Sequence, residues 1–156
     1  PRDIDKSLYT IGIVFGTESA STVLADVRSG EIVATEVHRY ADGVIDETLP
    51  HSTLRLPPEW ALQNPAAWLA AVEQTIPHVL RLSRIAPSLV IGIGLDFTAC
   101  TILPTIRDGT PLCALPHFHE RPHAWPKLWK HHAAQPHADR INELAVANRL
   151  GLKRHK

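Results

Sequence analysis

Residues 88–96 have the sequence SLVIGIGLD, an almost unbroken apolar run between a polar start and an acidic end. Such a run is typical of a strand that is buried on both faces of a sheet. Three shorter β-rich runs precede it, at residues 9–15, 21–27 and 31–37, and short Gly- and Ser-containing segments separate them. Connections this short cannot form a parallel crossover, so the three runs predict an antiparallel meander.

A helix is predicted between the meander and the apolar strand. Asn64 suits an N-cap and Pro65 suits the first turn, and apolar residues then recur at spacings of three and four. Pro77 lies within that pattern and is expected to kink or divide the helix. A right-handed crossover through this helix places the fourth strand beside the first. The resulting β-β-β-α-β order predicts an α/β fold of the ribonuclease H-like topology, on which actin-like ATPases are built.

The remaining segments are less regular. Residues 40–58 have no clear period and contain three prolines, so we expect a surface loop. Residues 101–105 and 111–115 are predicted to be short strands, and residues 125–150 to be mostly helical with a break near Pro136. We expect one domain over residues 1–156, ending in a basic tail at residues 150–156.

Composition excludes several classes of function. The 156 residues carry 16 Lys and Arg against 16 Asp and Glu, and this balance argues against nucleic acid as the main partner. No apolar run approaches the roughly 20 residues that span a bilayer, so no membrane partner is expected. The polar N-terminus lacks a signal peptide pattern, and the two cysteines are expected to be reduced, which together predict a cytoplasmic protein.

The first strand ends in a Gly-Thr turn, within GIVFGTES at residues 12–19. Such a turn offers backbone N–H groups and a hydroxyl as a phosphate-binding site, formed by Gly16, Thr17, Glu18 and Ser19. The same sequence also suits an ordinary turn. Four further stretches narrow the choice: GIGLDFTACT at 92–101, DGTPL at 108–112, RPHAW at 121–125 and LWKHHAA at 128–134.

Together and in this order, these stretches closely resemble the N-terminal part of the FGGY carbohydrate kinases, and among them the ribulokinases. The resemblance covers about residues 9–145. It implies a two-lobed actin-like enzyme that transfers the γ-phosphate of ATP, with Mg²⁺, to a ketopentose such as ribulose. By position it assigns these residues to the sugar site: Asp96, Thr98, Ala99, Trp125, Trp129, Lys130 and His132.

Two positions depart from the family pattern. The family has Asp-x-Gly-Thr on the first strand, where its carboxylate helps to hold Mg²⁺, but this chain has Val14. The basic residue usual four positions after Thr17 is replaced by Ser21. Phosphoryl transfer depends on positioning and charge neutralisation, so both changes weaken it. The resemblance places the general base and the adenine-binding lobe later than the matched residues, and no catalytic residue is assigned here.

Structural explanations compete with these assignments. Asp96 could simply cap a turn, and Trp125 and Trp129 could share one packing face of a helix. Six histidines fall between residues 117 and 137, which raises metal binding as a third possibility. Adjacent His131 and His132 would point in different directions, and neither cysteine joins a metal-binding spacing. A solvated surface is therefore the favoured interpretation, and no metal site is assigned.

Two functions remain open. The chain is either part of a ribulokinase-like enzyme that is inactive by itself, or a non-catalytic remnant that binds a sugar or another protein. In both cases the actin-like domain is expected to be incomplete, which should leave a sheet edge and an apolar face open to self-association.

Overall fold

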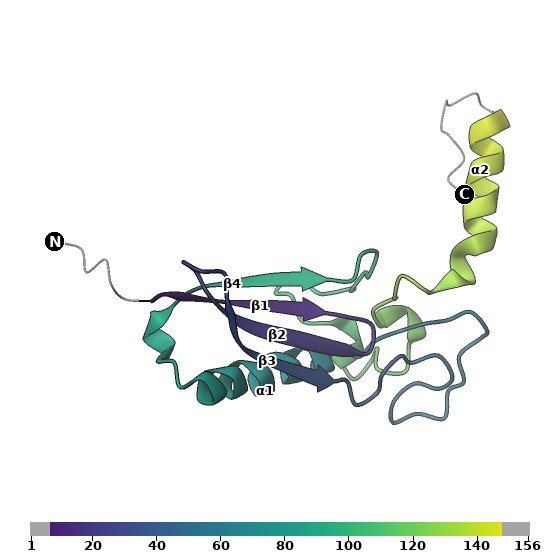
Figure 1. The fold of residues 1–156 in the computed structure, drawn as a ribbon. Coiled ribbons are helices and arrows are strands. Elements are labelled where there is room, and N and C mark those ends of the chain that lie inside the picture. Colours follow the sequence, from purple (N-terminus) through teal and green to yellow (C-terminus); the bar gives the residue numbers. More distant parts are fainter. Residues whose placement is uncertain (1–6, 148–156) are drawn as a thin grey trace.

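The computed structural model describes residues 7–147, which form a four-stranded sheet, a long helix against it and a less regular second part (Figure 1). The strands are β1 (Tyr9–Phe15), β2 (Ser19–Asp26), β3 (Ile32–Arg39) and β4 (Val90–Phe97). The helices are α1 (Pro65–Ser83) and α2 (Gln135–Ala147), with four short 3-10 helices at Pro87–Leu89, Leu112–Ala114, Pro122–Ala124 and His132–Ala134. The predicted basic tail lies outside the described residues.

The sheet has the order β3-β2-β1-β4. β1 pairs antiparallel with β2, β2 pairs antiparallel with β3, and β1 pairs parallel with β4. The predicted meander and the fourth strand beside the first are therefore confirmed. Side chains at alternate positions of β1, such as Ile11 and Ile13, face α1 and form the main hydrophobic core with Ala71 and Val79.

Helix α1 begins as expected and runs without interruption. The Asn64 side chain accepts a hydrogen bond from Ala66 N, and Pro65 occupies the first turn. The expected division at Pro77 does not occur, and the helix continues to Ser83. Pro77 is exposed, so the carbonyl that it leaves without a helical partner can be hydrated.

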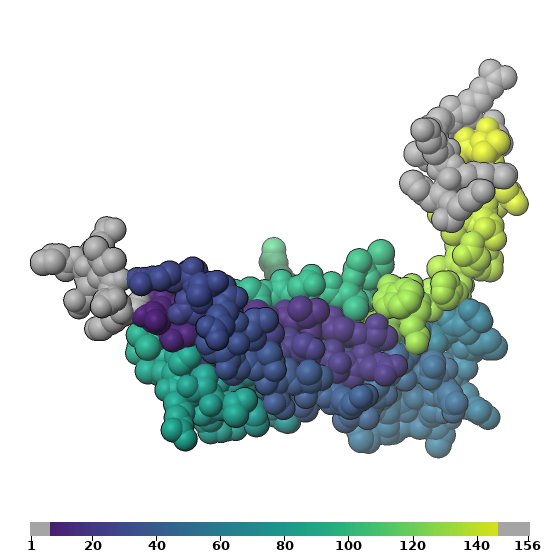
Figure 2. Space-filling model, viewed as in Figure 1, coloured from purple at the N-terminus to yellow at the C-terminus, as the bar shows by residue number. Residues whose placement is uncertain are grey.

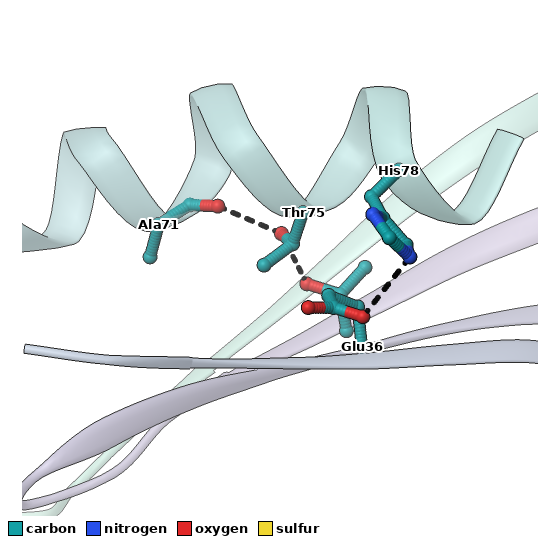
Figure 3. Close-up of polar contacts among 5 residues, drawn as sticks. Glu36, Ala71, Thr75 and His78 are labelled. Carbon is teal, nitrogen blue, oxygen red and sulfur yellow. Dashed lines mark hydrogen bonds and ion pairs between the residues drawn. The ribbon is translucent and has the colours of Figure 1, made fainter. Parts of the chain in front are cut away.

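A pair of hydroxyl groups connects α1 to the sheet (Figure 3). Thr22 on β2 and Thr75 on α1 are both fully buried, and their Oγ1 atoms lie 2.7 Å apart. Thr75 Oγ1 also donates to Ala71 O at 2.8 Å. Near the helix edge, His78 Nε2 lies 3.3 Å from Glu36 Oε2 of β3.

Strand β4 differs from the prediction. It is an edge strand of the described sheet rather than a strand buried on both faces, and Ile91, Ile93, Leu95 and Phe97 are 45–63% exposed. Helix α1 lies against β2 and β3 and leaves most of β4 uncovered (Figure 1). The apolar sequence of β4 is typical of a packed strand, but the described residues cover it only in part, chiefly at Phe97, which contacts Trp68 of α1.

The second part of the molecule also corrects several predictions. The expected loop at residues 40–58 contributes buried Ile45 and Leu49 to a second hydrophobic cluster, with Leu62 and Trp125. Residues 101–105 and 111–115 form only isolated β-bridges and one 3-10 turn, and Pro104 and Pro111 lack the N–H that a strand ladder uses. Regular helix occupies only residues 135–147 of the predicted 125–150, among the residues described.

Helix α2 extends away from the sheet (Figures 1 and 2). Pro136 lies in its first turn, where a proline is tolerated because the N–H has no helical partner, so the predicted break is the start of the helix. None of the helices in residues 7–147 is both long and apolar enough to cross a membrane.

Candidate functional site

The turn between β1 and β2 lies where several of the predicted site residues meet. Gly16 N donates to Ser19 O at 2.8 Å and closes this turn. A Cβ at Gly16 would lie 3.0 Å from Ser19 O, a contact so tight that the turn favours glycine there. The turn sits at the carboxyl end of β1, beside the carboxyl end of the parallel strand β4, and ligands of open α/β sheets bind at such ends.

Trp129 reaches this turn from a segment 112 residues later. Its indole Nε1 donates to Thr17 Oγ1 at 3.1 Å. This bond leaves the hydroxyl hydrogen of Thr17 available to another acceptor, because a hydroxyl accepts and donates at once. The Trp129 side chain is 55% exposed, so it presents apolar surface to solvent beside the turn.

The segment after β4 lies beside the same turn. Thr98 N donates to Phe15 O at 3.1 Å, and the Thr98 and Thr101 hydroxyls are 3.0 Å apart. Between them Ala99 is exposed, and Cys100 has a φ of 60°, in the left-handed region that non-glycine residues seldom adopt. Backbone strain of this kind is concentrated at functional sites. The Cys100 side chain is exposed, whereas that of Cys113 is buried.

Asp96 lies on the open face of the sheet. Its register partner in β1 is Val14, whose partner in β2 is Ser21, so all three side chains share the face opposite α1. The carboxylate is exposed and lies one strand away from the position where the resemblance expects an aspartate. No hydrogen bond holds Asp96 as a turn cap among the described residues.

The other predicted sugar-site residues are arranged differently. Trp125 is 2% exposed, packs in the second hydrophobic cluster and donates its indole N–H to His119 O at 2.8 Å. It therefore supports the fold instead of offering a surface to a ligand. The expectation that Trp125 and Trp129 share a helical face is wrong, because neither lies in a helix. Lys130 is half-buried next to Trp129, and His132 is exposed at the start of a 3-10 helix.

The histidine-rich segment packs around an aromatic ring. Trp60 has edge contacts with His123 and His131, at 4.9 and 4.8 Å between ring centroids, and Lys127 Nζ lies 5.7 Å from the Trp60 ring. His131 Nδ1 accepts a hydrogen bond from Ala61 N at 3.2 Å. Burial, and then the positive charge of Lys127 and the neighbouring histidines, lower the pKa of His131. Burial also lowers the pKa of Lys127. No group of three potential metal ligands occurs within residues 7–147.

Sequence reasoning missed Gln63. This side chain is 1% exposed, and its Nε2 donates to Thr17 O at 2.7 Å and to Gly16 O at 3.2 Å. Its position directly before the helix N-cap gave no sign of this role. A buried amide can be explained only once its partners are known, and these lie 46 and 47 residues earlier in the sequence.

Comparison with known structures shows which class of protein has this arrangement. Gluconate kinase from Lactobacillus acidophilus superposes with a TM-score of 0.66 at 17% identity, over 92% of this chain and 24% of that chain. Plasmodium falciparum glycerol kinase, solved with ADP, superposes with a TM-score of 0.57 at 11% identity, over 86% of this chain. The chain has the fold of the N-terminal part of an FGGY carbohydrate kinase, an incomplete actin-like domain.

Sequence comparison narrows the relationship further. The chain is 54% identical over 137 residues to a ribulokinase from Shouchella clausii and 52% identical over 138 residues to one from Geobacillus thermodenitrificans. Each match covers 88% of this chain and 24% of the relative, so the chain spans about a quarter of the length of these enzymes. No family model matches it. By sequence the chain is therefore similar to the N-terminal part of ribulokinases.

Proposed function

We propose that this chain supplies the sugar-binding side of a ribulokinase-like enzyme, which phosphorylates a ketopentose such as ribulose at its terminal hydroxyl in the cytoplasm. The observation that carries the proposal is the hydrogen bond between Trp129 and Thr17. It joins the candidate phosphate-binding turn to the Trp-Lys-x-His segment, and these are two of the motifs on which the resemblance rests. The 54% sequence identity with a ribulokinase supports a ketopentose as the substrate.

The local chemistry suits a small polyol. An exposed indole ring suits the C–H surface of a sugar, while threonine hydroxyls and the exposed Asp96 carboxylate suit its hydroxyl groups. The residues that we propose to contact the sugar are Asp96, Thr98, Ala99, Trp129 and Lys130. His132 would extend the same wall only if its side chain turns toward the site.

The family also implies ATP and Mg²⁺, and the residues at the carboxyl end of β1 do not fit that pair. Val14 offers no oxygen to a hard cation, and its register neighbour Ser21 offers no positive charge to a phosphate. Asp96 is the one carboxylate of this three-residue row. We therefore derive no catalytic step through Mg²⁺ and expect this chain to bind sugar without transferring phosphate.

Val14 and Ser21 favour a second candidate function. A non-catalytic descendant of the kinase could keep the residues proposed to contact the sugar, here called the sugar-binding wall, or use the exposed apolar strand β4 to bind another protein. The first candidate predicts sugar binding without turnover for this chain, and the second predicts either the same or binding of a protein through β4. The two candidates differ in whether restoring the two side chains restores nucleotide binding.

The test is calorimetric titration of the chain with ribulose, followed by an assay for ribulose phosphate in the presence of ATP and Mg²⁺. We expect saturable binding that Trp129→Ala abolishes and Phe118→Ala preserves, since Phe118 is a surface aromatic residue on a different loop. We expect no product above background. Absence of saturable binding to any ketopentose would contradict the proposed sugar site, and product formation would contradict the expected inactivity.

A further inference from the structure

Gln63 is a buried polar residue that the proposed sugar contacts leave without a role. Its amide nitrogen carries two hydrogens, and two consecutive carbonyl oxygens of the β1–β2 turn accept from it. An amide buried to 99% is costly unless its donors are used, and here both are used within the same turn. The contact is therefore specific for a group with two donors.

These two bonds fix the orientation of two peptide planes. In a planar trans peptide the carbonyl and the N–H point in opposite directions. When Gly16 O and Thr17 O point toward Gln63, the N–H groups of Thr17 and Glu18 must point away from it. Neither of these N–H groups has a backbone acceptor in residues 7–147. Two successive N–H groups that face outward form a concavity suited to an anion.

The same residue connects the turn to the sugar-binding wall. Gln63 N donates to Pro126 O at 3.2 Å, and Leu128 N donates to Ala61 O at 3.0 Å. This pairing places Trp129 where its indole N–H reaches Thr17 Oγ1. The turn is thus held by the Gln63 amide through its carbonyls and by Trp129 through its hydroxyl.

We infer that Gln63 is a positioning residue, which orients the N–H groups of Thr17 and Glu18 toward a phosphoryl group next to the sugar wall. The inference rests on the proposed function, because the kinase resemblance behind that function makes the β1–β2 turn the candidate phosphate-binding site. In this arrangement the turn binds an oxyanion through the two backbone N–H groups and the Thr17 hydroxyl. Gln63 itself does not touch the ligand.

The test is a tripolyphosphate titration of the ¹⁵N-labelled chain without Mg²⁺. In the unaltered chain we expect the amide resonances of Thr17 and Glu18 to shift most. Gln63→Met keeps the side-chain volume and removes both donors, so we expect about tenfold weaker binding and loss of those shifts. Gln63→His keeps one ring N–H donor and should recover part of the affinity.

A control variant separates positioning from stability. Asn64→Ala removes the N-cap of α1 next to Gln63 but leaves the turn contacts in place, so it should destabilise the chain and keep the affinity. Equal affinity in Gln63→Met and the unaltered chain would overturn the inference while leaving the phosphate-binding turn intact. Absence of any shift at residues 16–19 of the unaltered chain would overturn both. Ribulose binding, measured separately, shows whether the sugar site survives either result.

If Gln63→Met does not fold, the side-chain amide resonances of Gln63 in the unaltered chain provide a second measurement. They should shift with the same titration curve as Thr17 and Glu18, because the three groups share two peptide planes. Side-chain resonances that stay constant while the turn amides shift would also overturn the inference.

Discussion

Val14 lies on the open face of the sheet, between Ser21 of β2 and Asp96 of β4 in register. Neighbouring strands are about 4.8 Å apart, so a carboxylate at residue 14 would stand close to that of Asp96. Two carboxylates at that separation form an oxygen-rich pair for a divalent cation, whereas valine leaves Asp96 alone. The side chain at residue 14 therefore decides whether a cation at this position would meet two carboxylates or one.

Val14→Asp is expected to create measurable binding of Mn²⁺, used as a spectroscopic substitute for Mg²⁺. Binding should appear as Mn²⁺-induced broadening of resonances near Asp96 and be absent from the unaltered chain. Val14→Asn is the matched control, since the asparagine side chain has the shape of aspartate but carries no charge. Equal broadening in the Asp and Asn variants would show that the added carboxylate is not the cause.

His131 gives a pH dependence with a definite sign. Its pKa is lowered by burial and by nearby positive charge, so the unfolded chain binds a proton more readily than the folded chain. Its contribution to stability is therefore complete above its ordinary pKa of 6.5 and is lost as the pH falls below that value. Protonation also removes the Nδ1 acceptor used by Ala61 N.

Melting temperatures measured from pH 7.5 to pH 5 test this dependence. We expect the unaltered chain to lose stability toward pH 5. His131→Asn keeps an acceptor near the position of Nδ1 but does not titrate, so its melting temperature should fall less between pH 7.5 and pH 5 than that of the unaltered chain. Parallel curves for the two proteins would assign the acid sensitivity to other groups.

At the scale of secondary structure elements, the hydroxyls of Thr22 and Thr75 form a buried polar contact between β2 and α1. Thr75 donates its hydroxyl hydrogen to Ala71 O, so Thr22 must be the donor in the bond between the two hydroxyls. The two residues are therefore not equivalent. Removing the Thr75 hydroxyl leaves a buried donor without a partner, whereas removing the Thr22 hydroxyl leaves only an unused lone pair.

We expect Thr75→Val to lower the free energy of unfolding by about 1–3 kcal/mol, the cost of a buried unsatisfied donor. Thr22→Val should cost less, and the double variant should be at least as stable as Thr75→Val alone. Denaturant unfolding of the three variants measures the differences. A larger loss for Thr22→Val than for Thr75→Val would reverse the assigned direction of the hydrogen bond.

The elements that could be predicted from sequence are those whose pattern is local. The three meander strands, the Asn64 cap and the crossover to β4 follow from short turns, capping chemistry and periodicity. The exposure of β4 could not be predicted, because an apolar run does not show whether the residues that pack against it lie within residues 7–147. The helix predicted from residue 125 failed for a different reason, because Pro126 is a local signal against helix at its start, and regular helix begins only at Gln135.

The candidate site was predictable only in part. Thr17 was assigned from the chemistry of its turn and Trp129 from the resemblance, and the structure joins them by a hydrogen bond across 112 residues. Trp125 was assigned by the same reasoning, but its ring is buried against His119. Gln63 had no local signal, because its importance depends on carbonyl groups of another segment. Long-range polar contacts are thus the part of a site that sequence reasoning finds least readily.

At the scale of the whole molecule, the two edges of the described sheet differ in character. β3 carries Glu36, His38 and Arg39, and such charged side chains protect an edge from pairing with another chain. β4 carries Asp96 as its single charged residue. A groove of about 380 Å³ between α1 and β4, lined mainly by apolar side chains, continues this unprotected surface.

We expect a second copy of the chain to cover β4, so the protein should self-associate as its concentration rises. Ile93→Lys places a charge in the middle of the exposed apolar row, where its burial against another copy would be costly. Leu82→Lys is the matched control, because Leu82 is 61% exposed on α1 rather than on β4. Sedimentation velocity over a concentration series should show oligomers for the unaltered chain and Leu82→Lys, and monomers for Ile93→Lys. A chain that sediments as a monomer at every concentration would show that β4 is tolerated as a free edge, whereas dissociation by both substitutions would place the contact beyond β4.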